Sequence, residues 1–292
     1  MDLTSRGKQE VSPHPDLALR RPSRFAVPPG AVDTHAHVVG ARAAMAEDRS
    51  YTPPPASPEA YLRMLAATGM TFGVLVQVSV HGLDNSLLLQ TLRAHPARLR
   101  GIAVIDPAAS DESIAELADS GIAGLRMNTI TGAGIGLRHL PRYAEICAAM
   151  GWHLQFLANA ESLRPAAGQL AALSVPYVID HMGDFDASAG TSSPDWKFIL
   201  GLVRDGAWVK LSGAYRLAEP PYAATVPFAR SLVDAAPDRC LYGSDWPHTG
   251  FWGPMPNDGD LLDLLADWVP DDLLRRSILT TNAQRLYGFT KE

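Results

Sequence analysis

The sequence predicts an α/β protein folded as a single (β/α)8 TIM barrel with an extended N-terminal arm. Three observations support this class. Short β-rich runs alternate eight times with longer stretches that carry apolar residues at helical three-and-four spacing. No low-complexity linker interrupts the alternation, and a chain of 292 residues is long enough for one large barrel. We therefore expect the arm at residues 1–30 and the barrel at residues 31–292.

Each expected strand is a short run rich in β-branched, aromatic and other apolar residues. Runs of this kind are typical of parallel strands that are buried on both faces. They cover residues 31–38, 72–79, 100–106, 122–128, 152–158, 175–181, 207–212 and 239–245.

The expected helices lie between these runs. Ser57 and Ser193 each precede a proline, which places a capping hydroxyl before a residue that favours the first helical position. A final helical region, residues 258–286, should break near Pro270. The other expected helices cover residues 57–68, 85–95, 111–120, 140–150, 162–173, 194–204 and 222–235.

Composition narrows the classes of partner. A formal net charge of −6 and the lack of a basic cluster argue against nucleic acid as a partner. No run approaches the roughly 18 apolar residues of a membrane span, and the first 30 residues contain no apolar segment typical of a secretion signal. Cys147 and Cys240 lie in apolar segments, so we interpret both as buried, reduced thiols of a cytoplasmic protein. A homo-oligomer is compatible with the sequence.

In a TIM barrel the carboxyl ends of the strands form the catalytic face, so residues at the ends of the predicted strands should lie near the active site. Polar residues gather at these ends. They are His35 and His37 on the first strand, Ser79 and His81 after the second, Arg126 and Asn128 on the fourth, Asp180 and His181 on the sixth, Lys210, Ser212, Tyr215 and Arg216 around the seventh, and Ser244, Asp245 and His248 at the eighth.

The pair His35 and His37 is the most informative of these features. Side chains alternate along a strand, so both imidazoles should point the same way and could bind one metal ion or one substrate oxygen. A lone histidine at a strand end is more often structural, and we interpret His139 and His153 in that way. Arg126 and Arg216 could form surface salt bridges or bind a carboxylate or sulfonate through paired hydrogen bonds. Tyr51, Tyr215 and Asn159 are further candidates for substrate contact.

Three motifs carry a family resemblance: Val-Asp-Thr-His-Ala-His at residues 32–37, Ile-Asp-His-Met-Gly at 179–183, and Tyr-Gly-Ser-Asp-Trp-Pro-His at 242–248. They resemble the amidohydrolase superfamily in its amidohydrolase 2 branch. Residues 209–216 and the Asp-Trp-Pro-His ending resemble, more narrowly, the group that contains 2-pyrone-4,6-dicarboxylate lactonase, sulfomuconolactone hydrolase, fuconolactonase and galactarolactone isomerase. The resemblance covers residues 31–288.

The resemblance implies roles for individual residues. Asp245 would activate water, and Arg126 and Arg216 would contact carboxylates of the substrate. The implied set comprises His35, His37, His181, Asp245 and His248 as catalytic residues, with Arg126, Arg216 and Ser79 as substrate contacts.

Two departures from the family pattern limit what can be expected of the metal centre and of the substrate. Residues 156–159 offer neither lysine nor histidine at the end of the fifth strand, so a bridged two-metal centre is not expected. We expect either no metal or one divalent ion at His35, His37, His181 and Asp245, with zinc as the ion that best matches these ligands. Residues 129–132 replace the basic cluster expected after Arg126, which argues against the dicarboxylate as the substrate.

The sequence and its resemblance together predict a hydrolase. It would open the ester bond of an anionic lactone, carboxylated or sulfonated, with Asp245 as general base for water. The histidines would stabilise the developing oxyanion directly or through one metal ion. A lactone isomerase and a metal-dependent non-oxidative decarboxylase remain alternatives, and a non-catalytic ligand-binding barrel is a third.

Overall fold

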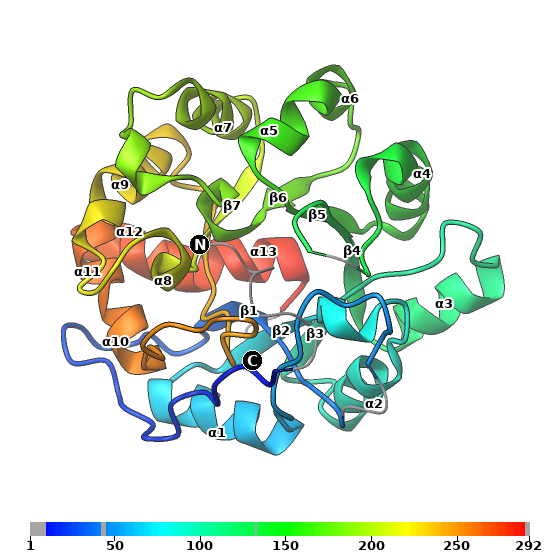
Figure 1. Cartoon of the computed structure of the whole chain (residues 1–292), viewed down its shortest axis with the longest axis horizontal. Helices are drawn as coiled ribbons and strands as arrows, with labels where there is room; N and C mark the ends of the chain where they lie inside the picture. The colour runs from blue at the N-terminus through cyan, green and yellow to red at the C-terminus, as the bar shows by residue number, and fades with distance from the viewer. Residues whose placement is uncertain (1–9, 42–44, 132, 290–292) are drawn as a thin grey trace.

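The computed structural model describes residues 10–41, 45–131 and 133–289, and shows a barrel of eight parallel strands surrounded by helices (Figure 1). The strands follow one another around the sheet in sequence order. The expected barrel is therefore confirmed; expectations for residues 1–9, 132 and 290–292 lie outside the described residues. The strands are β1 Val32–Ala36, β2 Phe72–Val76, β3 Leu99–Ala103, β4 Ile122–Asn128, β5 His153–Leu157, β6 Tyr177–Ile179, β7 Trp208–Leu211 and β8 Cys240–Tyr242.

The barrel closes between the end of β1 and the loop after β8. The amide of Asp245 donates to the carbonyl of His35 at 2.8 Å, and the amide of His37 donates to the carbonyl of Trp246 at 2.8 Å. Asp33 adds side-chain bonds, because its carboxylate accepts from the amide of Ser244 at 2.8 Å and from its hydroxyl at 2.7 Å. The closing contacts thus involve the same short segments that carry the candidate catalytic residues.

Several strands end earlier than the apolar runs predicted. After β6 the chain turns sharply, with His181 at φ 49° and Met182 at φ 55°. Asp245 lies beyond β8 at φ 61°, in the left-handed region that a strand cannot contain. Ser79 lies in a short 3-10 turn, η2 (Ser79–His81), beyond β2. The polar residues that the sequence placed at the ends of these strands therefore lie in the turns that follow them.

The helices confirm most of the expected elements. The hydroxyls of Ser57 and Ser193 accept hydrogen bonds from Ala60 and Trp196, as the capping prediction required. The last helical region does break around Pro270, between α11 and α12. The longer helices are α1 Pro58–Thr68, α2 Ser86–Ala94, α3 Asp111–Asp119, α4 Leu140–Met150, α7 Pro194–Arg204 and α9 Val226–Ala235; the shorter ones are α5 Ala160–Leu163, α6 Ala167–Ala171, α8 Ala214–Leu217, α10 Asp258–Asp263, α11 Leu265–Trp268, α12 Asp272–Ser277 and α13 Ala283–Tyr287.

Two expected helices differ from their predictions. The helix expected at residues 162–173 begins at Ala160 and divides into α5 and α6, with a 3-10 turn, Arg164–Ala166, between them. Pro165 lies in that turn and lacks the amide hydrogen that a continuous helix would use. The helix expected at 222–235 starts as a 3-10 turn, Ala223–Thr225, and becomes α-helical only at Val226.

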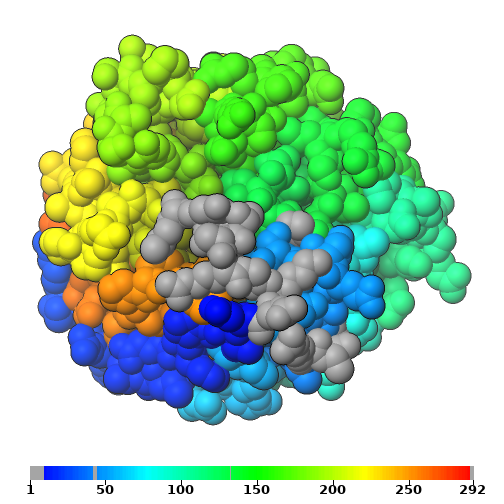
Figure 2. All heavy atoms as spheres, viewed as in Figure 1, coloured from blue at the N-terminus to red at the C-terminus, as the bar shows by residue number. Residues whose placement is uncertain are grey.

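Residues 10–30 run along the outside of the barrel without a helix or strand of their own, apart from one bridge between Val11 and Thr52. Arg20 pairs with Asp260 at 3.0 Å, and Ser23 and Arg24 donate backbone hydrogen bonds to Asp263. Figure 2 shows this blue segment beside the orange segment that follows β8. The described part of the expected arm is thus attached to α10.

The barrel interior has an apolar end. Side chains from six strands meet Ala283, Tyr287 and Phe289 of the C-terminal region, which is red in Figure 1 and crosses this end of the barrel. A larger apolar layer lies between the strands and the surrounding helices and contains Cys147 and Cys240, both free and buried. The strand residues at the apolar end are Val32, Val74, Val76, Ile102, Val178, Trp208 and Leu241. Among the described residues, no helix has the length and apolar character needed to cross a membrane.

Candidate active site

The two histidines of the first motif lie side by side, as the sequence predicts. Their rings are 5.0 Å apart at an interplanar angle of 86°. His37 Nδ1 lies 2.8 Å from the carbonyl oxygen of Val76, which can only accept a hydrogen bond, so Nδ1 carries the proton. In the neutral ring, Nε2 of His37 then presents a lone pair toward Asp245 Oδ1 at 3.5 Å.

His181 approaches the same point from the turn after β6. Its Nδ1 lies 2.9 Å from the hydroxyl of Ser212, and its ring is 4.6 Å from that of His35. Gly213 lies against this ring: a Cβ there would sit 3.1 Å from the imidazole, and its φ of 70° also favours glycine. The residue after Ser212 must therefore be small for His181 to occupy this position.

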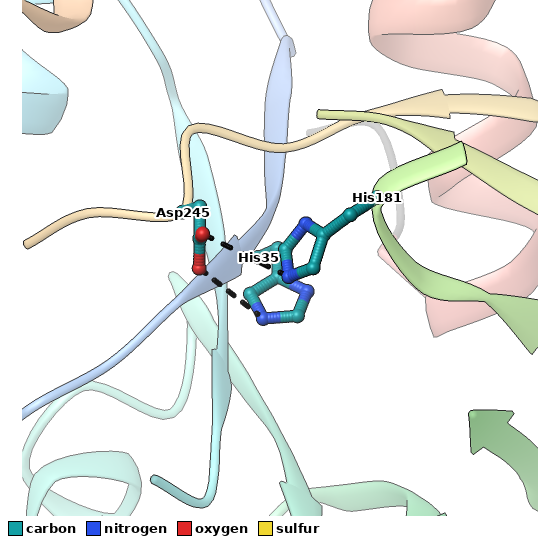
Figure 3. A group of neighbouring side chains, drawn as sticks. All are labelled: His35, His181 and Asp245. Atoms are coloured by element: carbon teal, nitrogen blue, oxygen red, sulfur yellow. Dashed lines mark ion pairs between the residues drawn. The ribbon is translucent and has the colours of Figure 1, made fainter. Parts of the chain in front are cut away.

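Asp245 divides its carboxylate between two sets of neighbours. Oδ2 accepts hydrogen bonds from Arg216 Nε at 2.8 Å and from the hydroxyl of Tyr215. Oδ1 is buried without a hydrogen-bond partner among the described residues, and Nε2 of His35 lies 3.7 Å away (Figure 3). Burial by itself would raise the pKa of Asp245, but the Arg216 guanidinium and the imidazoles hold it well below its usual value.

These atoms fit a divalent cation. One nitrogen each of His35 and His181 and one oxygen of Asp245 lie within 4.8 Å of one another (Figure 3), and Nε2 of His35 has no partner among the described residues. Burial lowers the pKa of His181 to about 4 and that of His35 well below its usual value, so both rings are neutral near pH 7 and offer lone pairs. Two imidazoles and a carboxylate are donor types that zinc binds in proteins.

A second polar group lies deeper in the barrel. The Asp180 carboxylate is 3.2 Å from His35 Nδ1, 3.2 Å from Lys210 Nζ and 3.0 Å from Gln155 Nε2. Arg126, expected to contact the substrate, donates from Nη1 to the carbonyl of Gln77 at 3.1 Å and has Nε 3.7 Å from Asp180. Burial would raise the pKa of Asp180, but the charges of Lys210 and its other neighbours keep it well below its usual value.

Three hydroxyl groups meet at the loops that follow β1, β2 and β8. The hydroxyl of Tyr51 lies 3.1 Å from that of Ser79 and 3.1 Å from that of Thr249. Arg216 Nη2 is 3.4 Å from the carbonyl oxygen of Thr249, so the guanidinium lies between these loops and Asp245. The structure thus brings together Tyr51, Ser79, Tyr215 and Arg216 of the expected substrate contacts.

Asn159 and His248 have other neighbours. The side-chain oxygen of Asn159 caps α5 by accepting from the amide of Ser162 at 3.0 Å, a structural use of a residue expected to contact substrate. The ring of His248 packs edge-on against Tyr215 at 4.9 Å, and its Nε2 is 3.3 Å from Asp258 Oδ1. Both residues of this pair are buried.

Sequence reasoning missed the interior partners of the site. Gln155, Asp258 and Thr249 were not among the candidates, and Lys210 was noted at a strand end without a role. A signal for Lys210 and Gln155 did exist, because each is a long polar side chain within a short, mostly apolar strand. The capping role of Asn159 also had a signal in Ser162, three residues further on.

Comparison with known proteins identifies the family to which the chain belongs. The sequence model of the amidohydrolase family matches residues 32–289, so the chain belongs to that family. The expected resemblance to the superfamily is thereby confirmed.

Particular relatives are more specific. The chain is 39% identical over 279 residues to 4-sulfomuconolactone hydrolase of Hydrogenophaga intermedia, covering 91% of each protein. It is 32% identical over 281 residues to the 2-pyrone-4,6-dicarboxylate hydrolase of Comamonas testosteroni, covering 90% of this chain and 92% of the relative. The crystal structure of a probable 2-pyrone-4,6-dicarboxylic acid hydrolase from Acinetobacter baumannii with citric acid bound is 28% identical, with a TM-score of 0.80 and coverage of 89% of this chain and 100% of that one.

Proposed function

We propose that the protein is a hydrolase that opens the ester bond of an anionic lactone. One observation carries the proposal: Asp245 Oδ1 belongs to an ionised carboxylate, has no hydrogen-bond partner among the described residues, and faces the Nε2 atoms of His35 and His37 within a buried site. The named activities of the two curated relatives, both hydrolases of anionic ring compounds, support the same reading.

Asp245 acts as the general base. Its Oδ2 is held by Arg216 and Tyr215, so Oδ1 is the oxygen that takes a proton from water. The water oxygen bonds to the lactone carbonyl carbon, the ring C–O bond breaks, and the ring oxygen leaves as an alkoxide or enolate that is then protonated. Because Arg216 and Tyr215 fix the carboxylate, Oδ1 does not have to reorient during the reaction.

His35, His37, His181 and Asp245 would hold one divalent ion, with zinc as the best match to three imidazoles and a carboxylate. When bound, such an ion polarises a carbonyl oxygen and stabilises the negative charge that develops on it. Burial lowers the pKa of His35 and of His181, and the resulting neutral rings keep their lone pairs available for this purpose. Metal analysis of protein purified without added ion should give clearly under two divalent ions per chain; a stoichiometric pair would contradict the proposal.

Arg216 and the hydroxyl groups of Tyr51 and Ser79 would bind the anionic substituent. Arg216 is the cation nearest to Asp245, and 18% of its side chain is exposed, whereas Arg126 is almost fully buried beside Asp180. We therefore assign substrate binding chiefly to Arg216. Contacts of Arg126, His248 and Asn159 with substrate stay predictions.

A lactone screen tests the proposal. Carboxylated, sulfonated and neutral lactones would be incubated with the enzyme, with and without a chelator, and the products followed by NMR. We expect ring-opened hydroxy or keto acids from anionic lactones, and lower rates after chelation. A product isomeric with the substrate would identify a lactone isomerase, and released carbon dioxide a decarboxylase; either would replace the proposal. Binding without turnover of any substrate would favour the non-catalytic barrel.

We also propose that residues 1–30 form an arm distinct from a barrel of residues 31–292, and that the protein works in the cytoplasm. The first part is supported by the absence of helices and strands from residues 10–30. The second is supported by two buried cysteines that stay free. Fractionation of cells that produce the protein tests the location.

A further inference from the structure

A charged lysine lies inside the barrel, below the candidate cation site. Lys210 on β7 is fully buried, and a buried ammonium without partners costs several kcal/mol. Its Nζ has three close neighbours: Gln155 Oε1 at 2.7 Å, Asp180 Oδ1 at 3.2 Å and His35 Nδ1 at 3.2 Å. The proposed hydrolysis uses no atom of Lys210, so another role must explain this position.

Lys210, Gln155 and Asp180 form a closed ring of polar contacts. Lys210 donates to Gln155 Oε1, and the amide nitrogen of Gln155 donates to Asp180 Oδ2 at 3.0 Å. Asp180 Oδ1 completes the ring at Lys210 and also faces His35. Each member comes from a different strand or strand end, β5, β6 and β7, and each is fully buried. The Asp180 carboxylate is thus fixed from both sides.

His35 Nδ1 faces one hydrogen-bond acceptor, Asp180, and one donor, Lys210. It can donate a proton to Asp180 Oδ1 or accept one from Lys210, both at 3.2 Å, but it cannot do both in one state. A proton on Nε2 instead would have no hydrogen-bond acceptor among the described residues, because Asp245 Oδ1 is 3.7 Å away, longer than a hydrogen bond. The geometry therefore favours the proton on Nδ1, shared with Asp180.

We propose that Lys210 and Gln155 are positioning residues, which hold the Asp180 carboxylate against His35 Nδ1 and so leave Nε2 of His35 unprotonated and turned toward Asp245. The inference deepens the proposed function, because it concerns the same site and rests on His35 presenting that lone pair. Without Lys210, Asp180 would keep its Oδ2 contacts with Gln155 and Arg126, but the Oδ1 that faces His35 would lose the ammonium that holds it, so the carboxylate could turn away from the ring. His35 could then exchange between its two tautomers.

Nitrogen-15 NMR of the histidine side chains tests this arrangement in the whole protein without substrate or added metal. His35 would be assigned by the signals lost in His35→Asn. The wild-type spectrum should show the proton of His35 on Nδ1 alone, and Lys210→Met should show both tautomers in exchange. Val178→Ala, a substitution in the apolar end of the barrel, is the matched control and should keep the wild-type pattern. A wild-type proton on Nε2, or an unchanged pattern in Lys210→Met, would overturn the proposal.

Gln155→Leu keeps the test decisive if Lys210→Met does not fold. It removes one side of the ring, retains both charges, and should also give two tautomers of His35. Folding of each variant would be checked by circular dichroism and thermal unfolding. A folded Gln155→Leu variant with the single wild-type tautomer would contradict the assignment of Gln155.

The affinity for zinc is a second measurement, and it should not change if Lys210 only stabilises the fold. Competition with a chromophoric chelator should show zinc bound about 10-fold more weakly by Lys210→Met than by wild type, the size expected for loss of an outer partner of a ligating histidine. Val178→Ala should match wild type, and equal affinity in all three proteins would count against the proposal. The NMR experiment needs no turnover, so failure of the inference is read separately from failure of the proposed lactone hydrolysis.

Discussion

The two ends of the barrel interior are built from the same strands but differ in chemistry. At one end, Val178 of β6 and Trp208 of β7 pack against Tyr287 and other apolar side chains. Two residues further along the chain, the same inward positions hold Asp180 and Lys210. A step of about 7 Å along a strand therefore changes the interior from apolar to charged.

The difference shows how one scaffold separates stability from chemistry. Burial of apolar surface stabilises the first end by roughly 25 cal/mol per Å². Polar groups buried at the second end stabilise the fold little and would destabilise it if left unpaired, at about 1 to 3 kcal/mol for each unmade hydrogen bond. Substitutions at the polar end should therefore act on turnover, and substitutions at the apolar end on unfolding.

Asp245→Asn should have the largest effect. It removes the proposed base and keeps the size of the side chain, so kcat should fall by about 10³-fold while the circular dichroism spectrum stays that of wild type. Initial rates on the best anionic lactone of the screen measure the change. Near-normal turnover would show that Asp245 is not the base, and the polar end of the barrel interior could then no longer be assigned the catalytic role.

Arg216→Met comes next. Arg216 holds Asp245 Oδ2 and is the cation proposed to bind the substrate anion, so kcat should fall and KM for an anionic lactone should rise by about 10- to 100-fold. A neutral lactone should suffer only the loss in kcat. Steady-state kinetics on the two substrates separate these effects. An equal rise of KM on both would deny Arg216 its role in binding the anion.

Val178→Ala should act in the opposite way. Loss of two buried methyl groups at the apolar end should lower the free energy of unfolding by roughly 2 kcal/mol, with kcat within about twofold of wild type. Urea unfolding and kinetics on the same preparation measure both. A large loss of turnover at full stability would show that the two ends are not separate in function.

The last prediction concerns pH, and its effect on stability is smallest near neutral pH. Burial lowers the pKa of His153, which packs on Tyr287, to about 3 in the folded protein, against 6.5 for an ordinary histidine. Between these values the unfolded chain binds a proton that the folded chain does not. The free energy of unfolding should therefore fall as pH drops from 6.5 toward 3, by up to about 1.4 kcal/mol per pH unit from this group.

His153→Phe should make that slope shallower by the same amount, whereas Val178→Ala should lower the whole curve and leave its slope unchanged. Urea unfolding between pH 4 and 7 supplies the curves. A slope in His153→Phe equal to that of wild type would assign the acid sensitivity to other groups.

The sequence predicted the eight strands because each is an apolar run bounded by turns, and it predicted the meeting of His35, His181 and Asp245 because barrel strand ends converge. It did not predict the ring of Gln155, Asp180 and Lys210. That ring depends on the alignment of β5, β6 and β7, in which Gln155 pairs with Val178, and no local pattern specifies such an alignment. The left-handed turns at His181 and Asp245 were also missed, since both follow apolar runs that continue a strand pattern.

The seam between β1 and β8 has a consequence for how the protein is made. During synthesis His35 leaves the ribosome long before Asp245, and their backbones bond to each other only where β1 and the loop after β8 meet. A partly synthesised chain therefore holds its imidazoles without the carboxylate that completes the site. If the proposed roles hold, a chain that has not yet closed this seam is inactive, so closure of the barrel and assembly of the site are one event.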